Sequence, residues 1–552
     1  MPNRQSKQDI RDNRQLGGDS DWWRGAVIYQ IYPCSYLDTN GDGIGDLAGI
    51  TQKLDYLAEL GVDAIWISPF FTSPMKDFGY DVSDYRGIDP MFGSHSDFAT
   101  LLEKAHSLGI RVLIDLVLSH TSDQHEWYKT SRQSRDNEKA DWYVWEDPKP
   151  DGSPPTNWLS IFGGSAWEWD SVRRQYFMHN FLTCQPDLNF HNPDVQDALL
   201  DVVRFWLDLG VDGFRLDTAN MYFHDAELRD NPPVAEGMVV NGVDPVNPYS
   251  MQEPKYNISR PETLGFMERF RKVLDEYPAV TSVGELGATV DMYQTVAAYT
   301  EEGKRLHKAY SFDFMTNTFN AAHLRSVVER TIQHIGSGWP CWAFSNHDVE
   351  RVISRWGVDR EAAPMLTALS TCLGGTACLY QGEELGLPEA EVAFEDLQDP
   401  FGIRFWPGYK GRDGCRTPMP WQKDEHLGGF SSAEQSWLPV PEEHLALAVS
   451  EQQGEGAVLQ RTRHFLHWRK QYPALLKGTI RFLDAPEGVL AFVREYQQEK
   501  LLCVFHLENS VFHFDTGLTD IEALNSEFFG SEWLNGECVL PAYGMFFGRM
   551  EA

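Results

Sequence analysis

Three acidic side chains stand within or at the end of strongly apolar segments. They are Asp217 in LGVDGFRLD (209–217), Glu285 in VTSVGELG (280–287) and Asp348 in PCWAFSNHD (340–348). Apolar runs rarely carry an acid unless it is paired or functional, because burying an unpaired charge is costly. A set of structural ion pairs is the alternative explanation, and it must then account for all three acids at once.

The types of these residues favour acid/base chemistry on an acetal. Cleavage of a glycosidic bond needs one carboxylic acid to protonate the leaving oxygen and a second carboxylate to capture or stabilise the oxocarbenium-like carbon. The chain also contains 18 Trp and 13% aromatic residues, which could supply stacking surfaces for sugar rings. Further polar residues lie in the same or similar runs: Asp115, His120, Arg215 and His347.

A short acidic segment, DTNGDGIGD (38–46), has oxygen-bearing side chains at alternating positions. These are Asp38, Asn40, Asp42 and Asp46, and Ile44 could add its backbone carbonyl. Hard oxygen ligands at this spacing suit one structural Ca²⁺ or Mg²⁺ ion, although the closing Glu of an EF-hand is missing. The alternative is a turn without an ion, because Asp, Asn and Gly favour turns in any case.

A repeated pattern of helix, glycine and buried strand must position these side chains. The phrases at 60–67, 108–116 and 209–217 each begin with Leu-Gly, and each follows an amphipathic run. The glycine is a helix stop, and the apolar run after it predicts a buried strand. Repetition of this unit predicts parallel βα units.

Five more apolar segments bring the predicted strands to eight. They are 25–33, 280–287, 309–315, 340–348 and 376–386. Eight buried strands alternating with helices predict an α/β fold of the (β/α)8 TIM-barrel type, in which chemistry takes place at the carboxyl ends of the strands. A doubly wound open sheet is the alternative, but no GxGxxG motif follows the first strand.

Three regions depart from the repeat. Residues 121–186 are too long for a loop after strand three and predict an inserted small domain. Residues 222–262 are rich in Pro and Asn and predict a flap over the site, and from 479 short β-type runs predict a C-terminal antiparallel β domain. The predicted organisation is a disordered tail at 1–20, a barrel at 21–120 and 187–478, an inserted domain at 121–186 and a β domain at 479–552.

Five short motifs resemble those of the α-amylase superfamily (glycoside hydrolase family 13), in its oligo-1,6-glucosidase/α-glucosidase branch. In chain order they are DLVLSH (115–120), QPDLN (185–189), GFRLDTAN (213–220), VGE (283–285) and SNHD (345–348). The resemblance extends from about residue 22 to the C-terminus. Together the motifs are highly specific, and the segment DTNGDGIGD (38–46) resembles the structural metal loop that this family has after the first strand.

The resemblance also implies a role for each matching residue. Asp217 is expected to be the nucleophile, Glu285 the general acid/base and Asp348 the third carboxylate, which holds sugar hydroxyls. Arg215 is expected to keep Asp217 ionised. His120 and His347 are expected to hydrogen-bond the sugar before the cleaved bond, on which Tyr80 stacks, and Asp77 and Arg412 to grip the non-reducing end. A surface arginine in a loop is the alternative for Arg412.

These roles predict a retaining, exo-acting α-glucosidase that releases α-glucose from short maltose- or sucrose-type glucosides. Thr218 follows the nucleophile where members of this branch that cut α-1,6 bonds typically have valine, so α-1,4 bonds are expected to be favoured. Transglucosylation is expected as well, because a covalent intermediate can be captured by a sugar or an alcohol. The alternatives are a glucosyltransferase or isomerase acting on sucrose or maltose, an oligo-1,6-glucosidase, and a non-catalytic protein on this fold.

Composition excludes several other classes of protein. The 552 residues carry 47 Lys+Arg and 81 Asp+Glu, a formal net charge of −34, which disfavours nucleic acid and anionic membranes as partners. The eight cysteines form no CxxC pair, so a zinc site is not expected. The first twenty residues lack an apolar signal sequence and no long apolar run occurs, which predicts a cytoplasmic protein without a membrane span. The expected partner is a small oligosaccharide or glucoside, and the oligomeric state is not predicted.

Overall fold

The computed structural model describes residues 19–550 except 302, 525 and 535. Eight parallel strands form the central sheet, in the order β11-β10-β9-β5-β2-β1-β13-β12. A parallel bridge between Ala309 and Pro340 joins the two ends of this sheet, so it curls into a nearly closed barrel. The strands are β1 Val27–Ile31, β2 Ala64–Ile67, β5 Arg111–Leu116, β9 Gly213–Leu216, β10 Thr281–Glu285, β11 Lys308–Tyr310, β12 Cys341–Ala343 and β13 Thr376–Tyr380.

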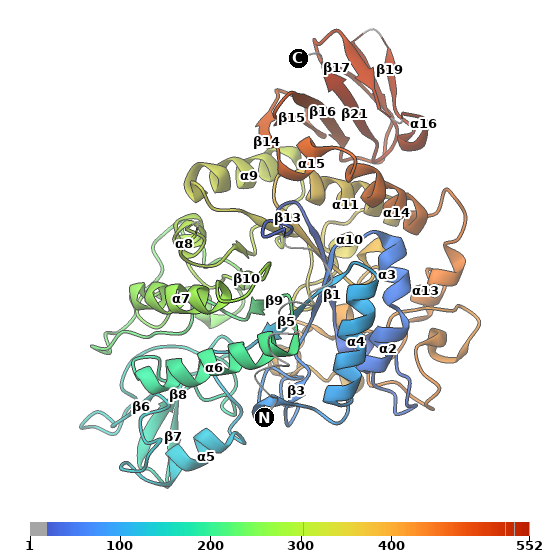
Figure 1. Cartoon of the computed structure of the whole chain (residues 1–552). Helices are drawn as coiled ribbons and strands as arrows, with labels where there is room; N and C mark the ends of the chain where they lie inside the picture. The colour runs from blue at the N-terminus through green and yellow to red at the C-terminus, as the bar shows by residue number, and fades with distance from the viewer. Residues whose placement is uncertain (1–18, 302, 525, 535, 551–552) are drawn as a thin grey trace.

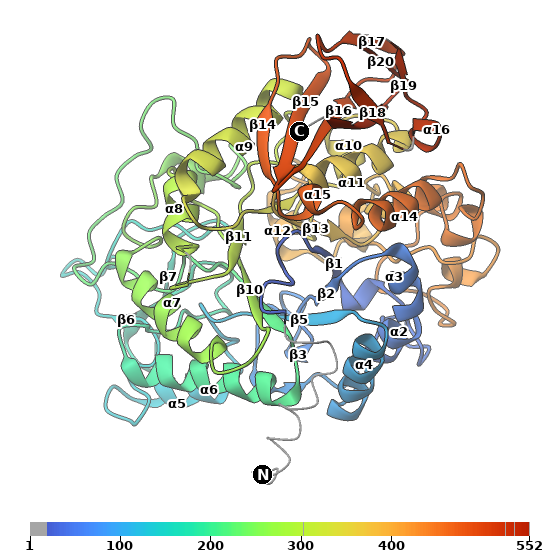
Figure 2. The ribbon, with the colours of Figure 1, turned by 45° about the horizontal axis from the view of Figure 1, so that its top comes forward.

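Helices surround this sheet on its outer side, as the views in Figures 1 and 2 show. The main ones are α2 Leu47–Gln52, α3 Leu54–Leu60, α4 His95–Ser107, α6 Pro193–Leu209, α7 Pro261–Leu274, α8 Met292–Tyr299, α9 Ala321–Ile335, α10 Val352–Arg355, α11 Ala363–Cys372 and α14 Val458–Arg469. Their apolar faces pack against the strands in one continuous core. The (β/α)8 barrel predicted from the sequence is therefore confirmed.

Local sequence explains where the helices before the strands begin and end. The side chain of Asn192 caps the first turn of α6, and Pro193 occupies its first position. Gly210 then ends the helix in the left-handed conformation, at φ 108°, which a residue with a Cβ adopts only at a cost. The chain can thus turn directly into β9, which carries Arg215 and leads to Asp217.

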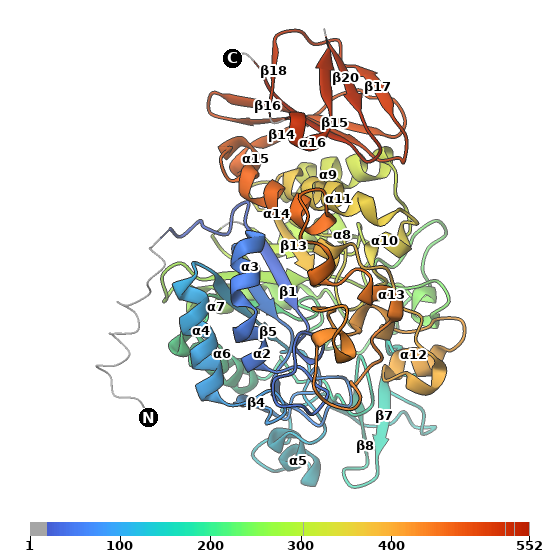
Figure 3. The same ribbon diagram turned by 90° about the vertical axis from the view of Figure 1, so that its right-hand side faces the viewer.

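Two groups of elements lie at opposite ends of the molecule (Figures 1 and 3). Between β5 and α6 lie α5 Glu126–Gln133 and a three-stranded antiparallel sheet of β6 Trp145–Glu146, β7 Trp167–Asp170 and β8 Gln175–Met178. At the other end, two antiparallel sheets contain β14 Thr479–Phe482, β15 Val489–Tyr496, β16 Glu499–His506, β17 Phe512–Asp515, β18 Ile521–Ala523, β19 Glu532–Leu534, β20 Glu537–Leu540 and β21 Met545–Met550.

The remaining elements are short. The strands are β3 Phe71–Thr72 and β4 Asp84–Ile88, and the helices are α12 Pro400–Phe405, α13 Glu442–Leu445, α15 Pro473–Lys477 and α16 Ser526–Phe529. The 3-10 turns are η1 Pro33–Ser35, η2 Pro248–Met251, η3 Arg360–Ala362, η4 Glu383–Leu385, η5 Phe394–Asp396, η6 Asp413–Arg416, η7 His426–Gly429 and η8 Val449–Glu451.

Several predictions from composition concern these elements. Residues 1–18, most of the tail predicted at 1–20, lie outside the described residues. All eight cysteines are free, and all but Cys184 are buried. None of the helices in the described residues combines the length and the apolar run that crossing a bilayer requires. The domain boundaries and the cytoplasmic location stay predictions.

Candidate active site

A cavity of about 590 Å³ opens at the carboxyl ends of the barrel strands. Its lining includes all three acids singled out in the sequence, Asp217, Glu285 and Asp348. Five of the six predicted substrate-binding residues also line it: Asp77, Tyr80, His120, His347 and Arg412. The sixth, Arg215, is fully buried directly beneath the acids and contacts two of them.

The register of the sheet brings the acids together around Arg215. In the register of the sheet, Asp115 on β5 lies opposite Arg215 on β9, and β10 is the neighbour of β9 on its other side. One guanidinium nitrogen of Arg215 lies 3.0 Å from Asp115 and 2.6 Å from Asp217, and another lies 2.8 Å from Glu285. Three carboxyl groups therefore share one fixed cation.

Burial beside a single arginine determines the protonation of Asp217 and Glu285. Burial raises the pKa of each carboxyl to about 7, because the nearby Arg215 only partly offsets the loss of solvation. Because the charge of Asp217 raises the pKa of the neighbouring Glu285, the two carboxyls titrate together near neutral pH. The pair can hold one proton there, which is the state that a nucleophile working beside a general acid requires.

The third acid, Asp348, has the opposite electrostatic environment. Burial alone would raise its pKa, but the charged guanidinium groups of Arg412 and Arg416 outweigh burial and hold it well below its ordinary value. Nitrogens of Arg412 and Arg416 lie 3.1 and 3.0 Å from the same oxygen of Asp348. Asp348 is therefore an anion throughout the neutral range, positioned to accept hydrogen bonds from sugar hydroxyls.

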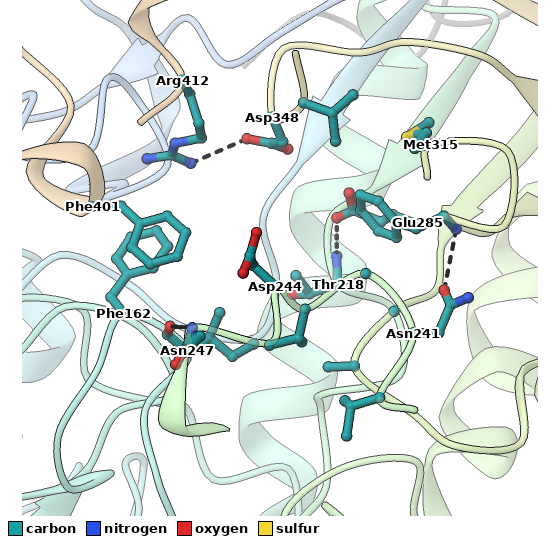
Figure 4. Close-up of a pocket in the computed structure, with 18 of the residues that line it drawn as sticks. Phe162, Thr218, Asn241, Asp244, Asn247, Glu285, Met315, Asp348, Phe401 and Arg412 are labelled. Carbon is teal, nitrogen blue, oxygen red and sulfur yellow. Dashed lines mark hydrogen bonds and ion pairs between the residues drawn. The ribbon is translucent and has the colours of Figure 1, made fainter. Parts of the chain in front are cut away.

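Arg412 closes one side of the cavity and is not a surface residue. Its side chain is buried and contacts Asp77 at 3.0 Å, Asp348 at 3.1 Å and Asp399 at 2.7 Å. Figure 4 shows Arg412 and Asp348 on the same side of the cavity, with the stacked rings of Phe162 and Phe401 close to Arg412. The predicted pairing of Asp77 with Arg412 is thus present, and the alternative of an exposed loop arginine is wrong.

The predicted sugar-binding histidines sit in networks with protein partners. Gln30 donates to Nδ1 of His347 at 2.7 Å, and Nε2 of His347 lies 2.5 Å from the hydroxyl of Tyr80. Burial lowers the pKa of both His120 and His347, so both rings are neutral. The ring centroids of Tyr80 and His347 lie 5.2 Å apart with nearly parallel planes, and both rings line the cavity.

Several residues that the sequence did not single out complete the site. Asp399 supports Arg412 from behind, Arg416 contacts Asp348, and Gln185 donates to Asp77 at 2.9 Å. Tyr310 contacts both Arg215 and Glu285. Gln185 stands in the recognised motif QPDLN, which could have indicated it, whereas nothing near Asp399 in the sequence shows that it meets Arg412.

Part of the segment 222–262, which the sequence predicted as a flap over the site, lines the cavity. The stretch 239–245, together with Asn247, lines it opposite the barrel. In Figure 4 the carboxylate of Asp244 points into the space between Arg412 and Thr218. Val239 is 71% exposed at this rim, so the flap contributes apolar as well as acidic surface to the entrance.

The predicted metal loop is held by its own hydrogen bonds. Asp38 accepts from the backbone of Asn40, Gly41 and Gly43. Asp46 caps α2 by accepting from Gly49. The donor set has the right chemistry for a hard cation, but no three acidic, histidine or cysteine side chains in the described residues converge to hold a metal ion. The turn alternative accounts for this geometry, and the ion stays a prediction.

Comparison with known proteins agrees with the geometry of the cavity. Residues 30–478 match the model of the α-amylase catalytic domain. A probable α-glucosidase of Rhizobium meliloti is 55% identical over 97% of this chain and 98% of its own length. An oligo-1,6-glucosidase of Heyndrickxia coagulans is 36% identical over 90% of this chain and 94% of its own. The crystal structure of an α-glucosyl transfer enzyme superposes with a TM-score of 0.93 at 54% identity, covering 96% of this chain and 99% of that one.

Proposed function

The chain belongs to the α-amylase family of glycoside hydrolases, and from that premise we propose that it is a retaining, exo-acting α-glucosidase. Asp217 is the nucleophile, Glu285 the general acid/base and Asp348 the carboxylate that holds the sugar. The observation that carries the proposal is one cavity that contains all three acids and is closed on one side by the Asp77–Arg412 pair. A pocket closed in this way accommodates a terminal glucose unit and leaves the interior of a long chain outside.

The reaction follows from the protonation of the pair. Ionised Asp217 attacks the anomeric carbon while protonated Glu285 gives its proton to the departing oxygen, so the glycosidic C–O bond breaks and a glucosyl ester forms. Glu285, now a carboxylate, then takes a proton from water or from an acceptor hydroxyl, whose oxygen displaces Asp217. The anomeric configuration is inverted twice and therefore retained.

The preferred bond is proposed to be α-1,4 within short substrates of the maltose or sucrose type. Thr218 lines the cavity beside the nucleophile, and its hydroxyl lies 3.3 Å from Asp217. Rates on maltose, sucrose and isomaltose test this preference, and Thr218→Val should raise the rate on isomaltose relative to maltose. A wild-type enzyme that prefers isomaltose would contradict the proposal and support the oligo-1,6-glucosidase alternative.

A glucosyl-transfer enzyme is the second candidate, favoured by the structural similarity to the α-glucosyl transfer enzyme. Both functions use the same glucosyl ester and differ in whether water or an alcohol accepts the sugar. Quantifying free glucose against glucosylated products from maltose, with and without an added alcohol, separates them. Predominant free glucose supports hydrolysis, and predominant transfer at low acceptor concentration supports the second candidate.

A further inference from the structure

Tyr310 lies beside Glu285 because of the register between two barrel strands. Glu285 ends β10 and Tyr310 ends β11, and the two residues are directly paired. Residues paired in adjacent parallel strands point to the same face of the sheet, and here that face is the barrel interior. Tyr310 is 1% exposed, so its hydroxyl must find its partners within the protein.

The direction of the hydrogen bond from Tyr310 is fixed by Arg215. Two guanidinium nitrogens of Arg215 donate to the phenolic oxygen at 3.2 and 2.9 Å. Arginine has no acceptor, so the one hydroxyl proton of Tyr310 is left to donate to Oε1 of Glu285, 3.2 Å away. Burial holds the pKa of the Tyr310 phenol well above its ordinary value, so it keeps this proton at all working pH values.

The other oxygen of Glu285 is held separately. Oε2 accepts from the backbone nitrogen of Thr218 at 3.1 Å and lies 2.8 Å from Arg215. The hydroxyl of Tyr310 has no described hydrogen bond to Asp217, which is held by Arg215 and by the hydroxyl of Thr218. The phenol therefore acts on the acid/base carboxyl and not directly on the nucleophile.

We propose that Tyr310 is a positioning residue for Glu285. The hydroxyl of Tyr310 orients the carboxyl of Glu285, and it stabilises the ionised carboxylate that forms when Glu285 gives its proton to the leaving group. This inference rests on the proposed function of Glu285 as the general acid/base. In the first step Glu285 becomes a carboxylate, and the hydrogen bond from Tyr310 strengthens as that charge develops. Tyr310 thereby makes Glu285 a stronger acid than burial alone would allow.

The test is Tyr310→Phe, which removes only the hydroxyl. Losing a donor to the carboxylate should raise the pKa of Glu285 and move the alkaline limb of kcat/KM for maltose upward by about one pH unit. The acid limb, which reports Asp217, should move much less. Turnover of maltose should fall by about fivefold to tenfold, whereas a dinitrophenyl α-glucoside, which needs little protonation, should lose less than about twofold.

Tyr222→Phe is the matched control. Tyr222 is also a buried tyrosine of this region, but its hydroxyl donates to the backbone carbonyl of Asp217 at 3.4 Å. This variant should leave the alkaline limb in place. An unchanged limb in Tyr310→Phe, an equal displacement of both limbs, or an equal loss on both substrates would overturn the proposal.

A second variant keeps the proposal testable if Tyr310→Phe does not fold. A fluorinated tyrosine incorporated at position 310 retains the shape of the side chain and is a more acidic donor, so it should move the alkaline limb downward. Movement in the opposite direction, or none, would count against the proposal. An inactive wild-type protein would instead refute the proposed function, which separates the two failures.

Discussion

At the residue scale, the site consists of carboxyl groups that compete for one buried cation. Asp115, Asp217 and Glu285 all contact Arg215, and only Asp348 has further arginines of its own. This difference in environment gives the acids different protonation states. Asp348 stays ionised, while the coupled pair keeps a proton available near neutral pH.

The pH profile of kcat/KM should therefore be bell-shaped with its maximum close to neutral pH. Activity requires ionised Asp217, so it falls when acid protonates the pair, and it requires protonated Glu285, so it falls again when alkali removes the last proton. Burial raises both pKa values to about 7, which places the two limbs on either side of neutrality. Initial rates on maltose between pH 4 and pH 10 check this, and a maximum below about pH 4.5 would contradict the raised values.

The two reacting carboxyls should differ in their response to the leaving group. Asp217→Asn should lower kcat by more than about a thousandfold on every substrate, because no nucleophile remains. Glu285→Gln should lower turnover of maltose by roughly a hundredfold or more but spare a dinitrophenyl α-glucoside, which departs without protonation. Each variant is the control for the other, and equal losses on both substrates would refute the assigned roles.

At the element scale, the strands could be predicted because the sequence marks where each helix stops. Gly61, Gly109 and Gly210 all adopt positive φ, as a glycine stop requires, and a buried strand follows each. The three proposed catalytic acids could be located because they lie at the end of a buried strand or soon after one: Glu285 ends β10, Asp217 follows β9 and Asp348 lies beyond β12. The contacts of Arg412 with Asp399 and of Arg416 with Asp348 could not, because they depend on how long irregular loops fold back over the barrel.

The predicted metal loop gives a test at the same scale. If one divalent ion binds Asp38, Asn40, Asp42, Asp46 and the Ile44 carbonyl, chelation should lower the melting temperature before it lowers the rate per folded molecule. An ion at 100 times its Kd stabilises the native state by about 2.7 kcal/mol. Asp42→Ala should mimic the chelator, and Glu103→Ala, which removes an exposed acid on α4, should not. Unchanged melting after exhaustive chelation would leave the turn alternative standing.

At the scale of the whole molecule, the pocket should decide which substrates reach the acids. The Asp77–Arg412 pair lies on one side of the cavity, and Asp244 of the predicted flap also lines it. The enzyme should therefore release single glucose units from maltose and maltotriose while leaving the viscosity of a starch solution almost unchanged. Chromatography of the products and viscometry check this together. A rapid fall in viscosity with large fragments would show an open cleft instead.

The central claim, double displacement through Asp217 and Glu285, is tested most directly by the anomeric form of the first glucose released. Proton NMR of a concentrated enzyme acting on maltose resolves the two anomers before they equilibrate. α-Glucose is expected to accumulate from the non-reducing end first, and β-glucose from this end is expected to appear only with the slower mutarotation. Because maltose also yields glucose from its reducing end, an α-glucoside of methanol provides the unambiguous version of the measurement. The β-anomer as first product would contradict the account.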